Sequence, residues 1–334
     1  MDFSLQASFD SLEFPASAWN ELLTGSVTDA PFLRHEYLST WWNTLGGGEW
    51  KDVKLALISA SEDGALRGIA PLFLNGSSLM LLGSIEISDY LDLIARPEHL
   101  PRFVTCLLDW LTTTYPEPWS LLDWVNLPEG SPTLAALKAE SVKRGWSYSE
   151  EIYQPTPTIP LPGDFETYLE SLDKKQRHEV RRKMRRAEES GRAVRWYIVT
   201  DAVALDAEMD AFIALMAHDP QKETFLTPAM RVQMKACARA AFHAGYLQLA
   251  FLEVDGQKAC AYLNFDYANR IWVYNSGLDR QFMDISPGWV LLGHLLQWAN
   301  DHKRSEFDFM RGDEEYKYRF GAVARHVMRV RARR

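Results

Sequence analysis

The sequence predicts an α/β protein made of two units of the same kind, and three observations carry this prediction. The order helix, three β-like runs joined by short turns, helix, β-like run occurs twice along the chain. The length of 334 residues is about twice that of a common domain. A proline-rich stretch, QPTPTIPLPGD (154–164), separates the two cycles. We therefore expect one domain at residues 1–153 and a second at residues 154–334.

Local patterns predict the individual elements, with apolar residues at helical spacing in the helices and short apolar runs between turn residues in the strands. The first half is expected to hold helices at 17–24, 31–45, 99–115 and 132–146, and strands at 53–60, 66–74, 78–84 and 119–127. The second half is expected to hold helices at 165–190, 203–217, 228–244 and 286–304, strands at 194–200 and 306–310, and three strands within 246–279 that turn at Asp255-Gly256 and Ala268-Asn269.

Composition narrows the classes of function. The net charge of −9 argues against indiscriminate binding of nucleic acid, so we expect no DNA partner and require local clustering of basic residues for any polyanion site. The N-terminus lacks the pattern of a signal peptide, and no window approaches the ~20 apolar residues of a membrane span. The three cysteines (Cys106, Cys237, Cys260) and the histidines show no metal-ligand spacing. We expect a soluble cytoplasmic protein with buried free thiols and no metal.

The basic segment SLDKKQRHEVRRKMRRAEESGR (171–192) is the strongest local anomaly. Its apolar residues form one narrow stripe at helical spacing, and Gly191 supplies a stop. Arginine offers forked donors that suit phosphate, so Arg177 and Arg181 are candidate contacts to a phosphate-bearing substrate. A solvated charged face, partly neutralised by glutamates of the same segment, is the alternative.

A second candidate anion site is the helix start at Ser286-Pro287-Gly288, which follows the run IWVYNSGLD. Unpaired N–H groups and the helix dipole both favour an anion at such a start. Ser286, Gly288 and the adjacent Trp289 are therefore candidates for holding the phosphate part of a co-substrate. An ordinary strand-to-helix loop is the alternative.

Three segments, taken with the order of elements, resemble the tandem form of the GNAT superfamily, which includes Fem-like (FemAB-like) peptidyltransferases and BioF2-like or CelD-like acetyltransferases. LDKKQRHEVRRKMRRAEESG (172–191) is similar to the region that opens their second domain. ISPGWVLLGHLLQWAND (285–301) with SEFDFMRGDEEYKYRFG (305–321) is similar to their ending, and LLGSIEISDYLDLIA (81–95) is similar to a stretch of their first domain. The resemblance implies two GNAT-like domains, each a mixed, mostly antiparallel sheet flanked by helices.

The resemblance also implies transfer of an acyl or aminoacyl group to an amine without a covalent enzyme intermediate. Acetyl-CoA or another acyl-CoA would be a co-substrate, and no cofactor would be tightly bound. The segment 280–288 is one glycine short of the GNAT pyrophosphate signature. Fem-like enzymes that use aminoacyl-tRNA also lack the usual CoA loop.

Direct aminolysis needs a neutral amine, a path for its proton and stabilisation of the oxyanion. The carboxylates that we expect to serve are Asp308, Asp313 and Glu314 in the second domain and Asp92 in the first. We expect residues 311–315 to form a turn at the mouth of a cleft between the domains. The candidates for contact with the substrate there are Lys317, Arg319, Tyr90 and Tyr316. The alternating aromatic residues at 316–320 fit a strand or a helix.

The function expected from the sequence is N-acylation of a small or cell-envelope-related acceptor by acyl-CoA in this cleft. One alternative is a Fem-like transferase that uses aminoacyl-tRNA, which makes tRNA a second candidate partner. The other is a degenerate GNAT pair that binds a nucleotide or acts as a scaffold.

Overall fold

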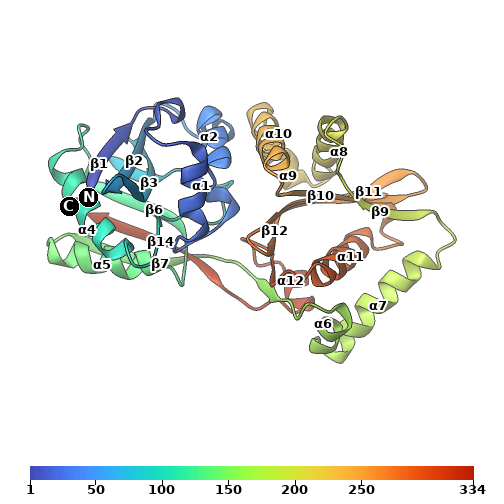
Figure 1. Ribbon diagram of the computed structural model, residues 1–334. Coiled ribbons are helices and arrows are strands. Elements are labelled where there is room, and N and C mark those ends of the chain that lie inside the picture. The colour runs from blue at the N-terminus through green and yellow to red at the C-terminus, as the bar shows by residue number, and fades with distance from the viewer. The chain divides into compact units, whose positions relative to one another are not determined.

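The computed structural model describes residues 1–334, which form two units (Figure 1). Unit 1 comprises Met1–Pro155 and His326–Arg334, and unit 2 comprises Thr156–Arg325. None of the helices combines the length and the apolar character that a membrane crossing needs.

Unit 1 is built on one mixed sheet with the strand order β1-β2-β3-β4-β6-β14-β7, and β5 pairs with β3. Strands β2, β3 and β4 form the expected antiparallel meander, whereas β6 runs parallel to β4. The strands are β1 (Asp2–Gln6), β2 (Lys54–Glu62), β3 (Ala65–Asn75), β4 (Ser78–Leu81), β5 (Ile94–Ala95), β6 (Leu121–Pro128), β7 (Ser147–Pro155) and β14 (His326–Arg333). The helices are α1 (Ala16–Thr24), α2 (His35–Asn43), α3 (Leu45–Gly48), α4 (Leu100–Thr113) and α5 (Pro132–Lys143), with short 3-10 turns η1 (Phe9–Ser11) and η2 (Pro31–Leu33).

The last strand corrects the predicted domain division. The expected boundary at 153/154 lies two residues from the observed change at 155/156, but β14 belongs to unit 1 and not to the second domain. It lies between β6 and β7 and is antiparallel to both. Val327, Val330 and Ala332 are buried, and Arg329 pairs with Asp123 of β6. Arginines make this strand hard to recognise in the sequence. In the fold they pair with carboxylates of the neighbouring strands.

Unit 2 repeats the meander and the parallel strand that follows it, in a second sheet with the order β8-β13-β12-β11-β10-β9. The meander β10-β11-β12 turns at Asp255-Gly256 and at Ala268-Asn269, as predicted, and all four residues have positive φ. Strand β13 then runs parallel to β12. The strands are β8 (Thr158–Pro160), β9 (Val194–Ile198), β10 (Leu247–Val254), β11 (Gln257–Tyr267), β12 (Arg270–Leu278) and β13 (Glu306–Asp308).

Helices cover both faces of the unit 2 sheet. Figure 1 shows α8, α9 and α10 on one face and α11, α12, α6 and α7 on the other. Asp173 caps α7 through the N–H of Gln176, and Thr227 caps α10 through that of Met230. The helices are α6 (Phe165–Ser171), α7 (Lys174–Glu188), α8 (Leu205–Met216), α9 (Pro220–Phe225), α10 (Pro228–His243), α11 (Pro287–Asp301) and α12 (Glu315–Arg319), with the 3-10 turn η3 (Arg280–Phe282). The long basic helix expected at 165–190 is therefore two helices, because Asp173 starts a new one.

The parallel strands of unit 2 separate after a short pairing. Strand β12 pairs with β13 only from Arg270 to Trp272, and it then continues to Leu278 along an edge that no strand covers. The corresponding region of unit 1 is filled by its own loop, since Asn126 of β6 donates to the carbonyls of Ile85 and Ser88 and accepts from the N–H of Leu91. At this position, between the two parallel strands, unit 2 has an open strand edge and unit 1 does not.

Candidate functional site

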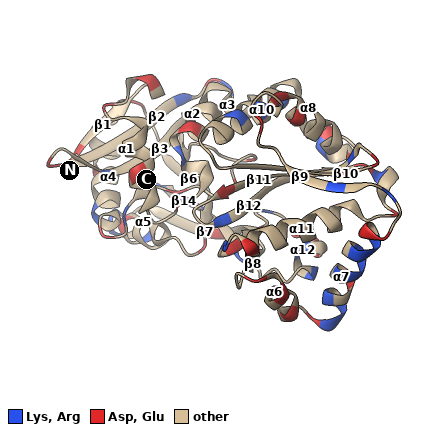
Figure 2. Cartoon of the chain, turned by 45° about the vertical axis from the view of Figure 1, so that its right-hand side comes forward, with Lys and Arg blue, Asp and Glu red and all other residues tan.

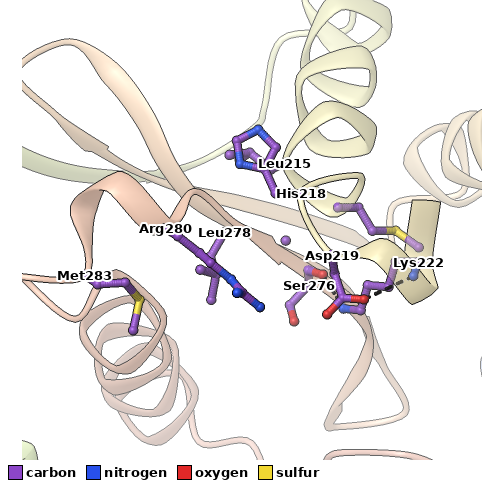
Figure 3. Close-up of a pocket in the computed structure, with 10 residues that line it drawn as sticks. Leu215, His218, Asp219, Lys222, Ser276, Leu278, Arg280 and Met283 are labelled. Carbon is purple, nitrogen blue, oxygen red and sulfur yellow. Dashed lines mark hydrogen bonds between the residues drawn. The ribbon is translucent and has the colours of Figure 1, made fainter.

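A pocket of about 420 Å³ lies where β12 ends on the open side of the unit 2 sheet. The end of α8, helix α9, the end of β12 and the loop from β12 to α11 supply its lining. The lining residues are Leu215, Met216, His218, Asp219, Lys222, Ser276, Gly277, Leu278, Arg280 and Met283. Figure 3 shows that Asp219, Ser276 and Arg280 point toward the same space.

Lys222 of α9 is the main titratable group of this pocket. Its Nζ donates to the carbonyl of Ser276 at 2.5 Å and to Asn275 Oδ1 at 2.9 Å. Burial lowers the pKa of the ammonium, while the charges of Asp219 and Glu314 oppose this shift. A lysine held in this way can lose its proton more readily than a lysine in water.

Arg280 gives the pocket an available cation. Its side chain is exposed toward the pocket and forms no ion pair, although its charge helps to lower the pKa of the Asp219 carboxyl. That carboxylate is itself occupied, since it accepts from the backbone N–H groups of Gln221 and Lys222 and so caps α9. The guanidinium of Arg280 therefore remains free to bind an anion.

Lys317 has a different role from the anion contact that the sequence suggested. Its side chain is 4% exposed, and its Nζ pairs with Glu314 at 2.8 Å. The same Nζ lies 3.0–3.3 Å from the carbonyl oxygens of Phe309, Arg311 and Gly312. Three N–H donors thus face four acceptors within the chain. The ammonium clamps the turn that follows β13 and is not available to an anion.

The three predicted carboxylates of unit 2 do lie close together around this turn. Asp308 is buried at the end of β13, where it accepts from the N–H of Met310 at 2.7 Å. Asp313 accepts from the Tyr318 hydroxyl at 2.6 Å, which raises the pKa of that tyrosine to about 12. Glu314 is 57% exposed. The negative charge of Glu314 also raises the pKa of Lys222. Of these three carboxylates, Glu314 is therefore the one that interacts with the pocket.

The aromatic residues of the turn form a helix, which answers the question left open by their alternation. Tyr316 lies in α12 and is partly buried, with its ring edge against Phe309 at 5.8 Å. Burial raises the pKa of Tyr316 well above its ordinary value. Arg319 faces outward and pairs with Glu315. Neither residue is an open substrate contact.

The predicted helix start forms as expected, with Ser286 as the N-cap of α11 in a left-handed conformation. No side chain caps this start, and Gly288 lies in the first turn. Trp289 instead packs inside the unit, against Phe320 at 4.6 Å and beneath the ammonium of Lys183 at 4.0 Å. Ser286 and Gly288 remain candidates for contact with a co-substrate, whereas Trp289 joins α7, α11 and α12.

The remaining candidates make contacts inside the chain. Arg181 pairs with Glu166 of α6, and Arg177 donates to the carbonyl of Glu170, so both fix α7 to α6. In unit 1, Asp92 is completely buried and accepts from the Thr28 and Ser131 hydroxyls at 2.6 and 2.5 Å. Tyr90 is also buried. Burial raises the pKa of Asp92, and its partner Ser131 is the N-cap of α5, so its contacts are structural and its catalytic role stays a prediction.

Sequence reasoning missed Lys222 and used Arg280 only as part of a signature. The segment DPQKETF contains an N-cap aspartate followed by proline, which predicts a helix start, but a single turn has no periodicity to detect. Only the fold brings this turn beside the end of β12.

Residues 174–318 match the family model of the acetyltransferase (GNAT) domain. No curated protein matches the chain in sequence. Three solved structures are similar along nearly the whole chain. They are FemX (12% identity, TM-score 0.66, 98% of this chain and 97% of that one), a conserved protein of unknown function from Bacteroides thetaiotaomicron (12%, 0.65, 100% of both), and the C-terminal domain of a protein described as a lysylphosphatidylglycerol synthetase from Agrobacterium fabrum (11%, 0.56, 95% and 92%).

The match of residues 174–318 falls within unit 2 and includes both the pocket and the clamped turn. At 11–12% identity, the likeness to solved structures shows a shared fold. Residues 174–318 therefore match a GNAT acetyltransferase domain, and the chain as a whole has a two-unit α/β fold similar to that of FemX.

Proposed function

We propose that unit 2 moves an acyl group from acyl-CoA to the amine of a small or cell-envelope-related acceptor. The observation that supports this most is the pocket at the open end of β12, where Arg280 and Lys222 line one space. The guanidinium offers donors to a phosphate oxygen of the donor molecule. The uncovered edge of β12 leads from that position toward the clamped turn.

Lys222 is the group that we assign to proton transfer. In its neutral form, two N–H groups donate to Asn275 and Ser276, and the lone pair is left for the pocket. The acceptor amine attacks the thioester carbonyl, its proton passes to Lys222 Nζ, and the C–S bond breaks as the carbonyl re-forms. The departing thiolate then takes the proton from Lys222. The products are an amide and the CoA thiol.

A covalent enzyme intermediate is not part of this proposal. Cys260 of β11 is the thiol that interacts electrostatically with Lys222. Burial raises the pKa of the Cys260 thiol to about 12. A buried thiol of this kind is a poor nucleophile at neutral pH, because the thiolate is the reactive form. This supports direct attack by the amine.

Two substitutions of Lys222 test the assignment. Wild-type kcat should rise with pH as Lys222 loses its proton, at an apparent pKa below the ordinary 10.5. Lys222→Met should lose about 10²–10⁴-fold in kcat together with this pH dependence. Lys222→Arg should lose as much, since arginine keeps its proton. Retention of the wild-type rate by Lys222→Arg would assign the residue to charge stabilisation and would contradict proton transfer.

The pH dependence of folding gives an independent check on the same group. The folded-state pKa of Lys222 is lowered, so the unfolded chain binds more protons between that value and 10.5. The free energy of unfolding of the wild type, relative to Lys222→Met, should therefore increase as the pH rises through this window. Urea unfolding at a series of pH values measures it, and a relative stability that falls over the same window would contradict the lowered pKa.

Aminoacyl transfer from aminoacyl-tRNA is the second candidate function. The observations that favour it are the basic helix α7, along which Lys and Arg residues follow one another (Figure 2), and the fold shared with FemX. Assays with acetyl-CoA and with aminoacyl-tRNA separate the two donors. Binding of either donor without product would instead favour a non-catalytic GNAT pair.

A further inference from the structure

A second pocket, which the proposed reaction does not use, lies at the C-terminal end of α7. It has a volume of about 380 Å³, and four of its eight lining residues are arginines. We name it the arginine pocket. Its lining residues are Arg182, Arg185, Arg186, Glu189, Ser190, Arg192, Asp284 and Ile285.

The carboxylates of the arginine pocket leave part of its positive charge uncompensated. Arg192 pairs with Asp255 at 2.7 Å and with Asp284 at 3.6 Å. Arg182 is held by Glu179 at 2.8 Å, whereas Arg185 reaches Glu189 only at 4.0 Å and Arg186 has no ion pair. Arg185 and Arg186 thus lack a close ion pair, and the two lining carboxylates, Glu189 and Asp284, are 71% and 58% exposed. Exposed pairs of this kind are weak and can be exchanged for a stronger anion.

The walls of the arginine pocket are held in place from both sides. Helix α7 packs on α11, and Val180 and Ala187 of α7 are buried in the core of unit 2. The guanidinium of Arg192 stacks over the ring of Phe282 at 5.3 Å while its ion pairs fix its position. Arginines in the last turn of a helix also stabilise its dipole. That role does not explain Arg192 and Asp284, which come from other segments and close the pocket.

We propose that the arginine pocket binds a phosphate monoester group of a substrate. The guanidinium groups of Arg185 and Arg186 offer forked donors to phosphate oxygens, and a phosphate can replace the weak contacts to Glu189 and Asp284. The phosphate can belong to the donor, such as the 3′-phosphate of CoA, or to a phosphorylated acceptor. The pocket adjoins the donor pocket through the loop 279–285, in which Met283 lines one and Asp284 lines the other. The proposal does not depend on the reaction assigned to Lys222.

Titration calorimetry of the full chain with inorganic pyrophosphate tests this site. Arg186→Ala should weaken binding by about tenfold or more without changing the unfolding midpoint, because Arg186 is exposed and unpaired. The matched control is Lys175→Ala, which removes the same charge from an exposed position at the other end of α7 and should leave the affinity unchanged. Arg186→Lys should give an intermediate loss, since it keeps the charge but not the fork.

The source of the phosphate is identified with acetyl-CoA and acetyl-dephospho-CoA. If Arg186→Ala weakens binding of acetyl-CoA but not of its dephospho form, the phosphate is that of the donor. If Arg186→Ala weakens binding of pyrophosphate but of neither CoA form, the site takes a phosphate that the donor does not carry. No binding of pyrophosphate to the wild type, or equal losses in Arg186→Ala and Lys175→Ala, would overturn the arginine pocket. Failure to bind any acyl-CoA would instead overturn the proposed donor.

Discussion

Lys317 shows how burial changes the role of a basic residue. In the sequence it stands among charged residues near the end of the GNAT-like segment, which suggested contact with an anion. In the fold its ammonium is surrounded by three carbonyl oxygens and the Glu314 carboxylate. A buried charge of this kind is held by its partners, and the turn depends on it.

Replacement of Lys317 by methionine should therefore affect stability before it affects ligand binding. Loss of the ammonium leaves buried carbonyls without a donor, and we expect a decrease of about 3 kcal/mol in the free energy of unfolding. The control is Arg319→Met two positions away, whose ion pair with Glu315 is exposed and should matter by about 0.5 kcal/mol. Urea unfolding measures both. If Lys317→Met kept the unfolding midpoint but lost affinity for the co-substrate, this would contradict the structural role and support the anion contact expected from the sequence.

Single residues were the hardest feature to predict from the sequence. The clustering of Asp308, Asp313 and Glu314 followed from their closeness in the chain and needed no fold. Asp92 was chosen for its residue type, but burial and two hydroxyl donors give it a structural role. Lys222 stands 54 residues before Ser276, and nothing local to either predicts their hydrogen bond.

Among the elements, the close approach of α8 to β12 depends on the absence of a side chain at Gly277. A Cβ at this position would lie 2.6 Å from the carbonyl carbon of Leu215 and 2.8 Å from the Cα of Met216. Both are backbone atoms, so the helix would have to move. The same three residues line the pocket at the end of β12, and its shape therefore depends on this contact.

Gly277→Ala should lower the free energy of unfolding by about 1–3 kcal/mol, because overpacking against backbone is not relieved by a change of rotamer. Gly288→Ala is the control, since its Cβ would meet only Leu278 at an ordinary 3.6 Å. Thermal and chemical unfolding of both variants provide the comparison. Equal stabilities would show that α8 shifts freely away from β12.

The long elements were predicted well because their patterns are local. The meanders, their tight turns and the helices α4, α8, α10 and α11 lie close to their expected bounds. Short elements were missed, among them β1, β8 and α9, because two to six residues carry too little periodicity. The break at Asp173 was also missed, although an N-cap aspartate is a known start signal.

At the scale of the whole molecule, the chain returns to unit 1 after it has completed unit 2. Strand β14 pairs with two neighbours along most of its length, whereas unit 2 completes its own sheet edge with β8. Sequence order alone assigned residues 326–334 to the second domain, since pairing over such a separation leaves no local trace. The folding of unit 1 therefore depends on the last nine residues of the chain.

This topology predicts different outcomes for two pieces of the protein. Residues 156–325 should fold alone, because they contain every strand and helix of unit 2. Residues 1–155 should not reach a stable fold without β14, because β6 and β7 lose the strand between them, and added peptide 326–334 should restore it. Circular dichroism during thermal unfolding tests this, and a cooperative transition of residues 1–155 alone would contradict it.

The central claim is that unit 2 binds an acyl-CoA through the pocket at the end of β12. Titration calorimetry of the full chain with acetyl-CoA tests it most directly, with Arg280→Ala as the matched variant. We predict saturable binding to the wild type that is about tenfold weaker in Arg280→Ala, and a ligand at a hundred times its Kd should add about 2.7 kcal/mol to the free energy of unfolding. No heat and no stabilisation with any acyl-CoA, together with clear binding of aminoacyl-tRNA, would contradict it.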